Sequence, residues 1–199
     1  MAKDLVNNAN SLKNAPLSQT FSQKTRMKFD TALVQTRWHS PLGIIILAAT
    51  EKGLAGLWFD GQKHLPPELT GPTIWPVKPD HPVLQEVISQ LTGYFSGQRS
   101  NFDVPLDLAY GTAFQQSVWQ ALLKIPQGRT ASYGEVSQRI GKPAAVRAVG
   151  AAVGRNPVSI IVPCHRVMGA NGSLTGYAGG LERKSALLRL EGVHHEGAA

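Results

Sequence analysis

Short apolar runs separated by polar turns mark the first patterned part of the chain. Ala32–Val34, Ile44–Ala49 and Leu54–Phe59 have strand length, and the turn Thr50–Gly53 separates the last two. Two such runs joined by a short Gly-containing turn are typical of a β-hairpin. We therefore predict a small antiparallel sheet, followed by a loop over residues 66–76, where prolines cluster.

The next pattern is helical. Apolar residues recur at three- and four-residue spacing over positions 83–95 and stop before Gly97, which predicts a helix with one apolar stripe that packs on the sheet. A linker runs from Pro105 to Gly111, and we place a domain boundary near residue 108. The predicted stripe consists of Val83, Leu84, Val87, Ile88, Leu91, Tyr94 and Phe95.

Two helix starts in the second half of the chain have the spacing of a capping box. Thr112 with Gln115 opens one predicted helix, and Ser132 with Glu135 opens another that ends at Ile140. Gly141 suits a left-handed helix end, and Pro143 suits the first turn of a further helix. Short helices joined by such a turn are typical of a helix-turn-helix.

The second helix of this pattern, Ala144–Val153, usually meets DNA in such a motif. Arg147 is its only long side chain, and its small residues would let a partner backbone come close. The same small residues would equally let the helix pack against its neighbours. The pattern alone leaves both interpretations open.

The run Ser159–Val162 follows Asn156-Pro157, is predicted to be extended, and leads to Pro163-Cys164-His165-Arg166. A lone cysteine is often a small buried hydrophobe. Here His165 can serve as a base, and the cationic neighbours are expected to lower the pKa of the Cys164 thiol. Adjacent residues of an extended chain point in opposite directions, so Cys164 and His165 need a turn or a bridging water to act together.

Composition excludes several classes. The chain has 199 residues, 42% of them hydrophobic, and a single cysteine, which rules out an internal disulfide and a multi-cysteine metal site. No apolar run approaches the roughly 20 residues of a membrane span, and no signal-peptide core is visible, so a cytoplasmic protein is expected. Residues 1–28 are polar and basic and are predicted to be a flexible extension outside the fold.

The charge is unevenly distributed. The net charge of +7 divides into +4 for residues 1–28, −3 for residues 29–108 and +6 for residues 109–199. A basic half favours a polyanionic partner such as nucleic acid, although solvated surface charge would give the same count.

Several short motifs in the second half occur together in one known order. Their spacing resembles that of the O6-alkylguanine-DNA alkyltransferases, also called methylated-DNA–protein-cysteine methyltransferases. The likeness is strong over residues 109–192 and weak over 29–108. The motifs are Ser132-Tyr133-Gly134-Glu135, Arg147-Ala148-Val149-Gly150, Asn156-Pro157, Pro163-Cys164-His165-Arg166-Val167, Gly176-Tyr177-Ala178-Gly179-Gly180 and Leu190-Glu191-Gly192.

The resemblance implies an α/β (α+β) fold. A small ribonuclease-H-like N-terminal domain with an antiparallel sheet, residues 29–108, would precede a mostly helical domain with a winged-helix-like helix-turn-helix, residues 109–199. The implied protein repairs DNA: it flips O6-alkylguanine, mainly O6-methylguanine, out of the duplex. O4-methylthymine is implied as a further substrate. It then moves the alkyl group irreversibly to Cys164, once per molecule.

The resemblance also implies a role for each matching residue. Arg147 would enter the space left by the flipped base in the minor groove, with Ala148, Ala151 and Ala152 letting the helix sit deep. Cys164 would attack the alkyl carbon, His165 would take the thiol proton through water, Glu191 would orient the imidazole and Tyr133 would bond the guanine ring nitrogen. The base would be read by the carbonyls of Cys164 and Val167 and by the loop of Tyr177, Ala178 and Gly179, while Asn156 would brace the turn before Cys164.

We expect no cofactor and no zinc, because no cysteine precedes Cys164 and His39, His64 and His81 lack ligand spacing. The expected partner is double-stranded DNA carrying the lesion, bound by a monomer, with cooperativity left open. The expected cellular location is the cytoplasm, and the nucleus as well in a eukaryote. The alternative function is a DNA-binding regulator or a damage sensor without transfer; a cysteine hydrolase would need an oxyanion hole, for which no motif is visible.

Overall fold

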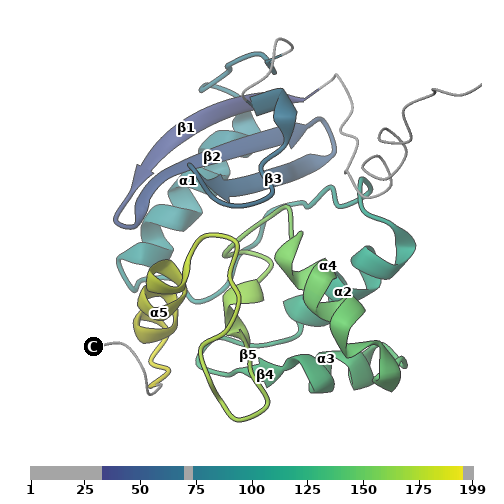
Figure 1. The fold of residues 1–199 in the computed structure, drawn as a ribbon. Coiled ribbons are helices and arrows are strands. Elements are labelled where there is room, and N and C mark those ends of the chain that lie inside the picture. The colour runs from purple at the N-terminus through teal and green to yellow at the C-terminus, as the bar shows by residue number, and fades with distance from the viewer. Residues whose placement is uncertain (1–32, 70–73, 195–199) are drawn as a thin grey trace, which may run out of the picture.

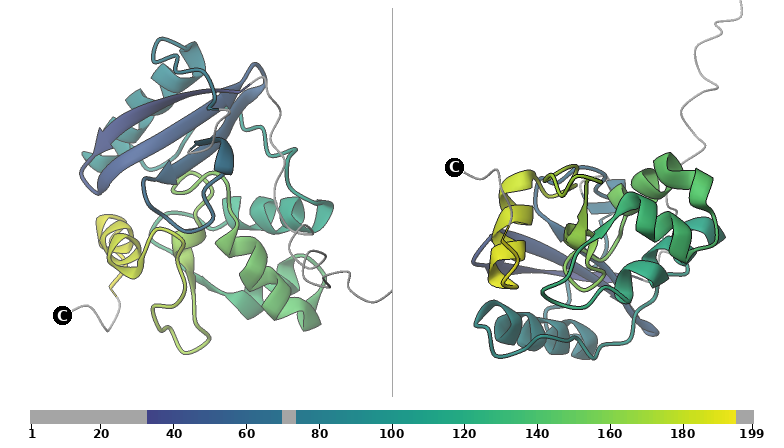
Figure 2. Two further views of the ribbon diagram at one scale, coloured as in Figure 1. Left: turned by 45° about the horizontal axis from the view of Figure 1, so that its top comes forward. Right: turned by 90° about the horizontal axis from the view of Figure 1, so that it is seen from below.

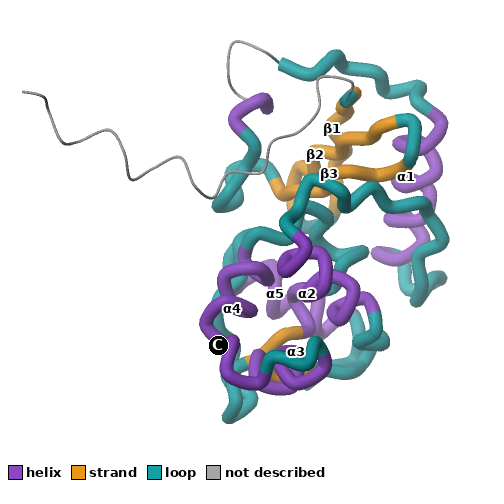
Figure 3. Tube along the Cα trace, turned by 90° about the vertical axis from the view of Figure 1, so that its right-hand side faces the viewer, coloured by secondary structure: helices purple, strands orange, loops and turns teal. Residues whose placement is uncertain are grey.

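The structure, a computed structural model, describes residues 33–69 and 74–194. The chain forms two lobes that lie against each other, a sheet with its helix and a mainly helical lobe (Figure 3). The predicted extension, residues 1–28, lies outside the described residues. Within the described ranges, no helix is long and apolar enough to cross a membrane.

An antiparallel sheet forms the first lobe, as the apolar runs predict (Figure 1). Its strands are β1 (Val34–Ser40), β2 (Gly43–Thr50) and β3 (Gly53–Phe59), in the order β1-β2-β3. The predicted hairpin is confirmed as β2 and β3. β1 extends beyond the predicted apolar run. Its later residues alternate between half-buried and exposed positions, so this part of the strand has no consecutive apolar residues from which it could have been predicted.

Helix α1 (Pro82–Phe95) packs on all three strands, as its stripe predicts, and Figure 2 shows it lying along the sheet. Leu84 and Val87 of α1 are fully buried in one cluster with Leu47 and Leu57 of the sheet. Burying these side chains against the strands is the main force that holds the helix in place.

The other face of the sheet is covered by the segment after β3, which includes the 3-10 helix η1 (Pro67–Leu69). Trp58 of β3 packs there with Trp75, at 6.3 Å between ring centroids. The Trp58 ring lies directly over Gly56, where an added Cβ would be 1.8 Å from the ring atom Cη2. Only glycine leaves room for this ring.

The second lobe contains α2 (Ala113–Leu123), α3 (Tyr133–Arg139) and α4 (Val146–Gly154). Both predicted capping boxes are confirmed, Thr112 with Gln115 at α2 and Ser132 with Glu135 at α3. In each box the cap hydroxyl accepts the backbone N–H of the third helical residue, whose side chain accepts the backbone N–H of the cap.

Helices α3 and α4 form the predicted helix-turn-helix. Gly141 lies between them with a φ of +70°, a conformation that favours glycine. Pro143 opens a 3-10 turn, η2 (Pro143–Ala145), so α4 begins at Val146, later than predicted.

Two features of this lobe have no counterpart in the sequence prediction. One is helix α5 (Leu181–Leu190), which lies below the sheet in Figure 1. The other is a parallel pair of two-residue strands, β4 (Ala131–Ser132) and β5 (Val167–Met168). β5 directly follows the 3-10 helix η3 (Cys164–Arg166).

The prediction that Ser159–Val162 is extended is wrong, because the chain turns there. Val158 makes a single bridge to Leu57 of β3, and the N–H of Val162 then donates back to the carbonyl of Val158 at 2.9 Å. Ile160 adopts a φ of +70° within this turn. The apolar side chains of the run are buried by packing around the turn instead of within a strand.

We expect Gly56→Ala to lower the free energy of unfolding by about 1–3 kcal/mol, because the new methyl group overlaps the buried Trp58 ring. Urea unfolding of the purified protein measures the change. Gly154→Ala is the matched control, since a Cβ at this last residue of α4 meets nothing within 4 Å. Equal losses in the two variants would contradict the explanation by overlap.

Candidate functional site

Cys164 opens η3 and lies beneath the surface, 4% exposed, between the sheet and the helical lobe. Its Sγ accepts a hydrogen bond from Nδ2 of Asn156 at 3.0 Å. The preceding turn, not an extended strand, carries the cysteine to this place. The thiol is therefore held by a specific donor in a nearly closed site.

Burial raises the pKa of the Cys164 thiol, although the bond from Asn156 and the positive charge of Lys184 act in the opposite direction. The sequence-based expectation of a lowered pKa is therefore wrong in direction. Desolvation of a thiolate outweighs the cations nearby. The cysteine rests as a neutral thiol and must lose its proton during any reaction in which it attacks.

The side chain of Asn156 organises the turn before the cysteine. Its Nδ2 donates to the carbonyls of Val162 at 2.7 Å and Val158 at 3.3 Å, while its Oδ1 accepts the N–H of Val158 at 3.0 Å. Asn156 is 4% exposed, so these bonds form away from water. The amide thus bonds to both the turn and the thiol, and the bracing role expected of it stays a prediction.

A buried carboxylate lies behind His165. Oε1 of Glu191 accepts from Nε2 of His165 at 2.9 Å and from the hydroxyl of Tyr94 at 2.8 Å. Arg166 donates to both oxygens of Glu191, at 2.8 Å from Nε and 2.8 Å from Nη2. Burial alone would raise the pKa of Glu191, but the bonds from His165 and Arg166 reverse this and lower it to about 2.

His165 is fully buried, and burial lowers its pKa even though Glu191 acts in the opposite direction. The imidazole is therefore neutral near pH 7. Because ionised Glu191 can only accept, the ring proton lies on Nε2, and Nδ1 keeps its lone pair. Nδ1 is buried and has no hydrogen-bond partner among the described residues, so it is a free base within the site.

Lys184 of α5 was missed in the sequence. It is fully buried, and its Nζ donates to the carbonyls of Val167 at 2.5 Å and Thr175 at 2.6 Å. Burial lowers the pKa of Lys184 to about 8, against the opposing effect of Cys164. Its spacing before Leu187 and Leu188 puts it on the apolar face of α5, a signal that could have identified it.

Tyr94 and Arg166 have contacts that the sequence did not predict. The sequence placed Tyr94 in an apolar stripe and treated Arg166 as a cation beside the thiol. Tyr94 keeps that packing role with its ring, yet its hydroxyl reaches Glu191. Arg166 is 7% exposed and directs its guanidinium to Glu191. No local pattern predicts a contact between residues 97 positions apart.

Tyr133 stands between α4 and the loop of residues 176–180. Its hydroxyl donates to the carbonyl of Gly176 at 3.4 Å, and a Cβ built on Gly150 of α4 would lie 3.8 Å from its ring. Burial raises the pKa of Tyr133, with Cys164 nearby adding to the effect, so the hydroxyl stays protonated. In the same loop, burial raises the pKa of Tyr177, and the carbonyl of Ala178 accepts the N–H of Lys63 at 3.0 Å.

The outer face of α4 carries Arg147, Ala148 and Ala151, all exposed. Ala152 does not lie on this face: it is 2% exposed, and its carbonyl accepts the indole N–H of Trp119 at 3.0 Å. Helical periodicity turns it toward α2, which corrects its place among the predicted DNA contacts.

Among residues 33–69 and 74–194, no three His, Cys, Asp or Glu side chains are grouped as metal ligands.

Two family models match this chain. The model described as "6-O-methylguanine DNA methyltransferase, ribonuclease-like domain" matches residues 33–108, and the model described as "6-O-methylguanine DNA methyltransferase, DNA binding domain" matches residues 113–193. Together they cover nearly all of the described residues.

Individual proteins and structures are similar to this chain over most of their length. The methylated-DNA–protein-cysteine methyltransferase of Mycobacterium bovis is 51% identical over 152 residues, 76% of this chain and 88% of that protein. That of Methanosarcina acetivorans is 49% identical over 155 residues, 78% and 96% of the two chains. The crystal structure of Mycobacterium tuberculosis OGT in complex with DNA has a TM-score of 0.70 at 48% identity and covers 80% of this chain and 91% of that chain.

Stability should depend on pH through Glu191. Its folded pKa of about 2 lies below the ordinary value of 4.5, so its contribution is complete above pH 4.5 and is lost as the pH falls toward 2. Between these limits we expect the free energy of unfolding of the wild type to fall by about 3 kcal/mol more than that of Glu191→Gln. The stabilities of the two proteins should therefore converge in acid. Denaturant unfolding at a series of pH values measures both.

Glu182→Gln is the matched control, because Glu182 is an exposed carboxylate on the same helix. It should follow the wild-type profile. Tyr94→Phe removes only one donor to Glu191 and gives a smaller effect in the same direction, which keeps the test available if Glu191→Gln does not fold. Parallel profiles of Glu191→Gln and wild type would contradict the assignment.

Proposed function

We infer that this chain, which belongs to the 6-O-methylguanine DNA methyltransferase family, is a DNA repair protein that transfers the alkyl group of O6-alkylguanine to its own cysteine. Cys164 is the only cysteine in the sequence, so it is the acceptor. The observation that carries the proposal is the arrangement of these groups: a buried thiol fixed by Asn156 and, at the next position of the chain, a buried neutral histidine with a free ring nitrogen.

The substrate is double-stranded DNA with the lesion, mainly O6-methylguanine and also O4-methylthymine. The alkyl carbon lies within the base stack, so the base must leave the duplex before a buried thiol can reach it. The exposed face of α4, with Arg147 as its long side chain and Ala148 and Ala151 as its small ones, suits a minor groove. Arg147 fills the space that the flipped base leaves.

Transfer forms one bond and breaks another. The sulfur of Cys164 attacks the alkyl carbon as the bond from that carbon to O6 breaks, and the guanine leaves with the bonding electrons. The thiol proton passes through water to the free Nδ1 of His165, and overall one proton moves from the protein to the restored guanine, which stays in the DNA. Glu191 holds His165 in the tautomer that this step needs and stabilises the imidazolium that forms.

The base is read by groups around the thiol. The Tyr133 hydroxyl, protonated because burial raises its pKa, donates to the guanine ring nitrogen and offsets the charge that develops there. The carbonyls of Cys164 and Val167 accept from the exocyclic amine. Val167 already accepts from Lys184, but a carbonyl oxygen has a second lone pair for the base. The loop of Tyr177, Ala178 and Gly179 closes over O6 through the Ala178 N–H.

The product limits each molecule to a single reaction. A thioether at Cys164 has no leaving group that water can displace readily, so the alkyl group stays on the protein. We assign residues 29–108 and 109–199 to two domains, the second of which binds DNA and carries the transfer site. We place the protein in the cytoplasm as a monomer, without cofactor or metal.

Incubation with duplex DNA containing O6-methylguanine, followed by intact mass measurement, tests the transfer. We expect every protein molecule to gain one methyl group and then to stop, and Cys164→Ala to gain none. DNA binding without a change of protein mass would instead support a damage sensor. Repeated turnover would exclude a stable thioether.

Arg147→Ala should lower the transfer rate on duplex DNA by about tenfold or more, because its side chain offsets part of the few kcal/mol that unstacking costs. The rate with the free base should fall much less, since no base has to be flipped. Arg139→Ala is the control, as Arg139 is an exposed arginine of α3 and its loss changes the charge equally. Equal losses on duplex and free base would remove the proposed role of Arg147.

A further inference from the structure

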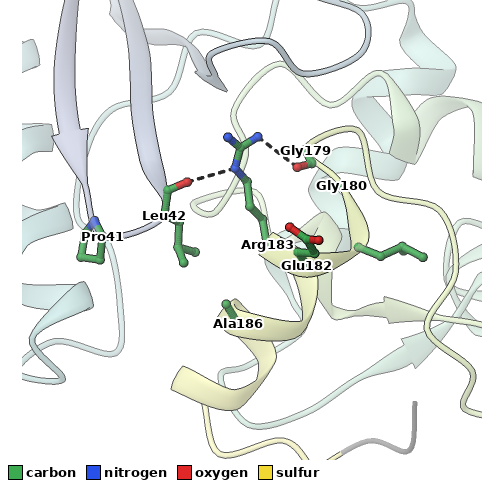
Figure 4. A pocket seen from close by; sticks show the side chains of 8 residues that line it. Pro41, Leu42, Gly179, Gly180, Glu182, Arg183 and Ala186 are labelled. Carbon is green, nitrogen blue, oxygen red and sulfur yellow. Dashed lines mark hydrogen bonds between the residues drawn. The ribbon is translucent and has the colours of Figure 1, made fainter. Parts of the chain in front are cut away.

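Arg183 of α5 crosses a hollow of about 830 Å³ between the turn joining β1 to β2 and the start of α5 (Figure 4). Its Nε donates to the carbonyl of Leu42 in that turn at 3.0 Å. Its Nη1 donates to the carbonyl of Gly179 in the loop of residues 176–180 at 3.1 Å. One side chain thus connects the sheet of the N-terminal domain to the loop beside Cys164.

The guanidinium of Arg183 has little freedom. It lies over the ring of Phe59 at the end of β3, with Cζ 4.7 Å from the ring centroid. A Cβ built on Gly43 would be 3.3 Å from its Nη2, so the turn also approaches it closely. An arginine held by two carbonyls and an aromatic face is oriented on several sides.

The N-terminal domain reaches the same loop at a second point. The backbone N–H of Lys63 donates to the carbonyl of Ala178 at 3.0 Å. The segment that carries Lys63 is itself fixed, because buried Gln62 accepts the N–H of Phe59 at 2.9 Å. The carbonyl of Ala178 is therefore held by the segment after β3, and that of Gly179 by Arg183, which itself bonds to the turn between β1 and β2.

These contacts determine the direction of the Ala178 N–H. Each peptide unit is planar, so fixing the carbonyl of Gly179 also fixes the N–H of Gly180. That N–H donates to the carbonyl of Tyr177 at 3.1 Å, and this carbonyl shares a peptide plane with the N–H of Ala178. The bond from Arg183 thereby orients the Ala178 N–H two peptide units away.

We propose that Arg183 is a positioning residue of the transfer reaction, which holds the loop of residues 176–180 against the N-terminal domain so that the Ala178 N–H faces O6 of the flipped base. The proposal rests on the proposed function. Glycine-rich segments lose much conformational freedom when they are ordered, so a loop with three glycines needs such external contacts. Small displacements of a group that contacts the reacting atoms reduce rates strongly.

Three variants test the role of Arg183. Arg183→Ala removes both bonds. Arg183→Lys keeps the charge but replaces the two separate nitrogens, Nε and Nη1, that donate to Leu42 and Gly179 in the fixed fork of a guanidinium. Arg189→Ala is the matched control, since Arg189 lies on the same helix, is exposed and donates to Ser185 of that helix.

The first measurement is deuterium uptake by the peptide covering residues 176–181 in the free protein, which does not depend on activity. We expect faster uptake in Arg183→Ala and Arg183→Lys, and wild-type uptake in Arg189→Ala. Unchanged uptake in both Arg183 variants would overturn the proposal, whether or not the protein transfers alkyl groups.

The second measurement separates DNA affinity from the transfer step in single-turnover kinetics with O6-methylguanine duplex. We expect both Arg183 variants to lower the limiting rate by about 10- to 100-fold, with the DNA dissociation constant and melting temperature near those of the wild type. A wild-type limiting rate in Arg183→Lys would show that only the positive charge at this position matters, and would overturn the proposal. Absence of transfer by the wild type would instead contradict the proposed function, while the uptake result would still decide the role of Arg183.

Discussion

The buried carboxylate of Glu191 is the interaction on which the site depends. An ion removed from water is stabilised only if its lone pairs are filled, and here Tyr94, His165 and Arg166 fill them. These partners come from α1 and η3, while Glu191 ends α5. The carboxylate therefore joins the sheet lobe to the transfer site. It also determines the tautomer of His165, and so leaves a basic nitrogen inside the fold.

The N-terminal domain supports this chemistry without contributing a reacting group. The backbone of Leu57 in β3 pairs with residues 157 and 159, the turn that Asn156 fixes to the thiol. Tyr94 reaches Glu191, and Lys63 with Arg183 holds the loop at Ala178 and Gly179. Each contact connects the N-terminal domain, directly or through Arg183, to the part of the second lobe that surrounds Cys164. Loss of the sheet would thus leave the residues around Cys164 present but without a fixed arrangement.

The basic half of the chain divides its cations between two tasks. Arg166 and Lys184 are buried, where they neutralise Glu191 and bind backbone carbonyls near the thiol. The exposed ones, such as Arg139 and Arg147 on the helix-turn-helix, remain available to a polyanion. The net charge of residues 109–199 therefore overstates the charge that DNA can meet. Cations near a thiol likewise do not ensure a thiolate, since burial of Cys164 outweighs them.

The sequence by itself determined the local features of this protein. The hairpin of β2 and β3, the stripe of α1 and both capping boxes are set by residues within a few positions of each other, and periodicity and capping chemistry act over that range. The order of the motifs between Ser132 and Gly192 identified the candidate site through their resemblance to one family. The role of each residue was taken from resemblance, not from periodicity.

Only the tertiary structure decided how distant residues meet. The bond between Tyr94 and Glu191, the burial of Lys184 and the turn at Ser159–Val162 depend on packing between segments that are distant in the chain, which no local pattern records. Packing of α4 against α2 buries Ala152, and burial raises the pKa of the Cys164 thiol against the expectation from its cationic neighbours. Desolvation and long-range hydrogen bonds arise only when the chain is folded, so they set the chemical state of the residues that the sequence had named.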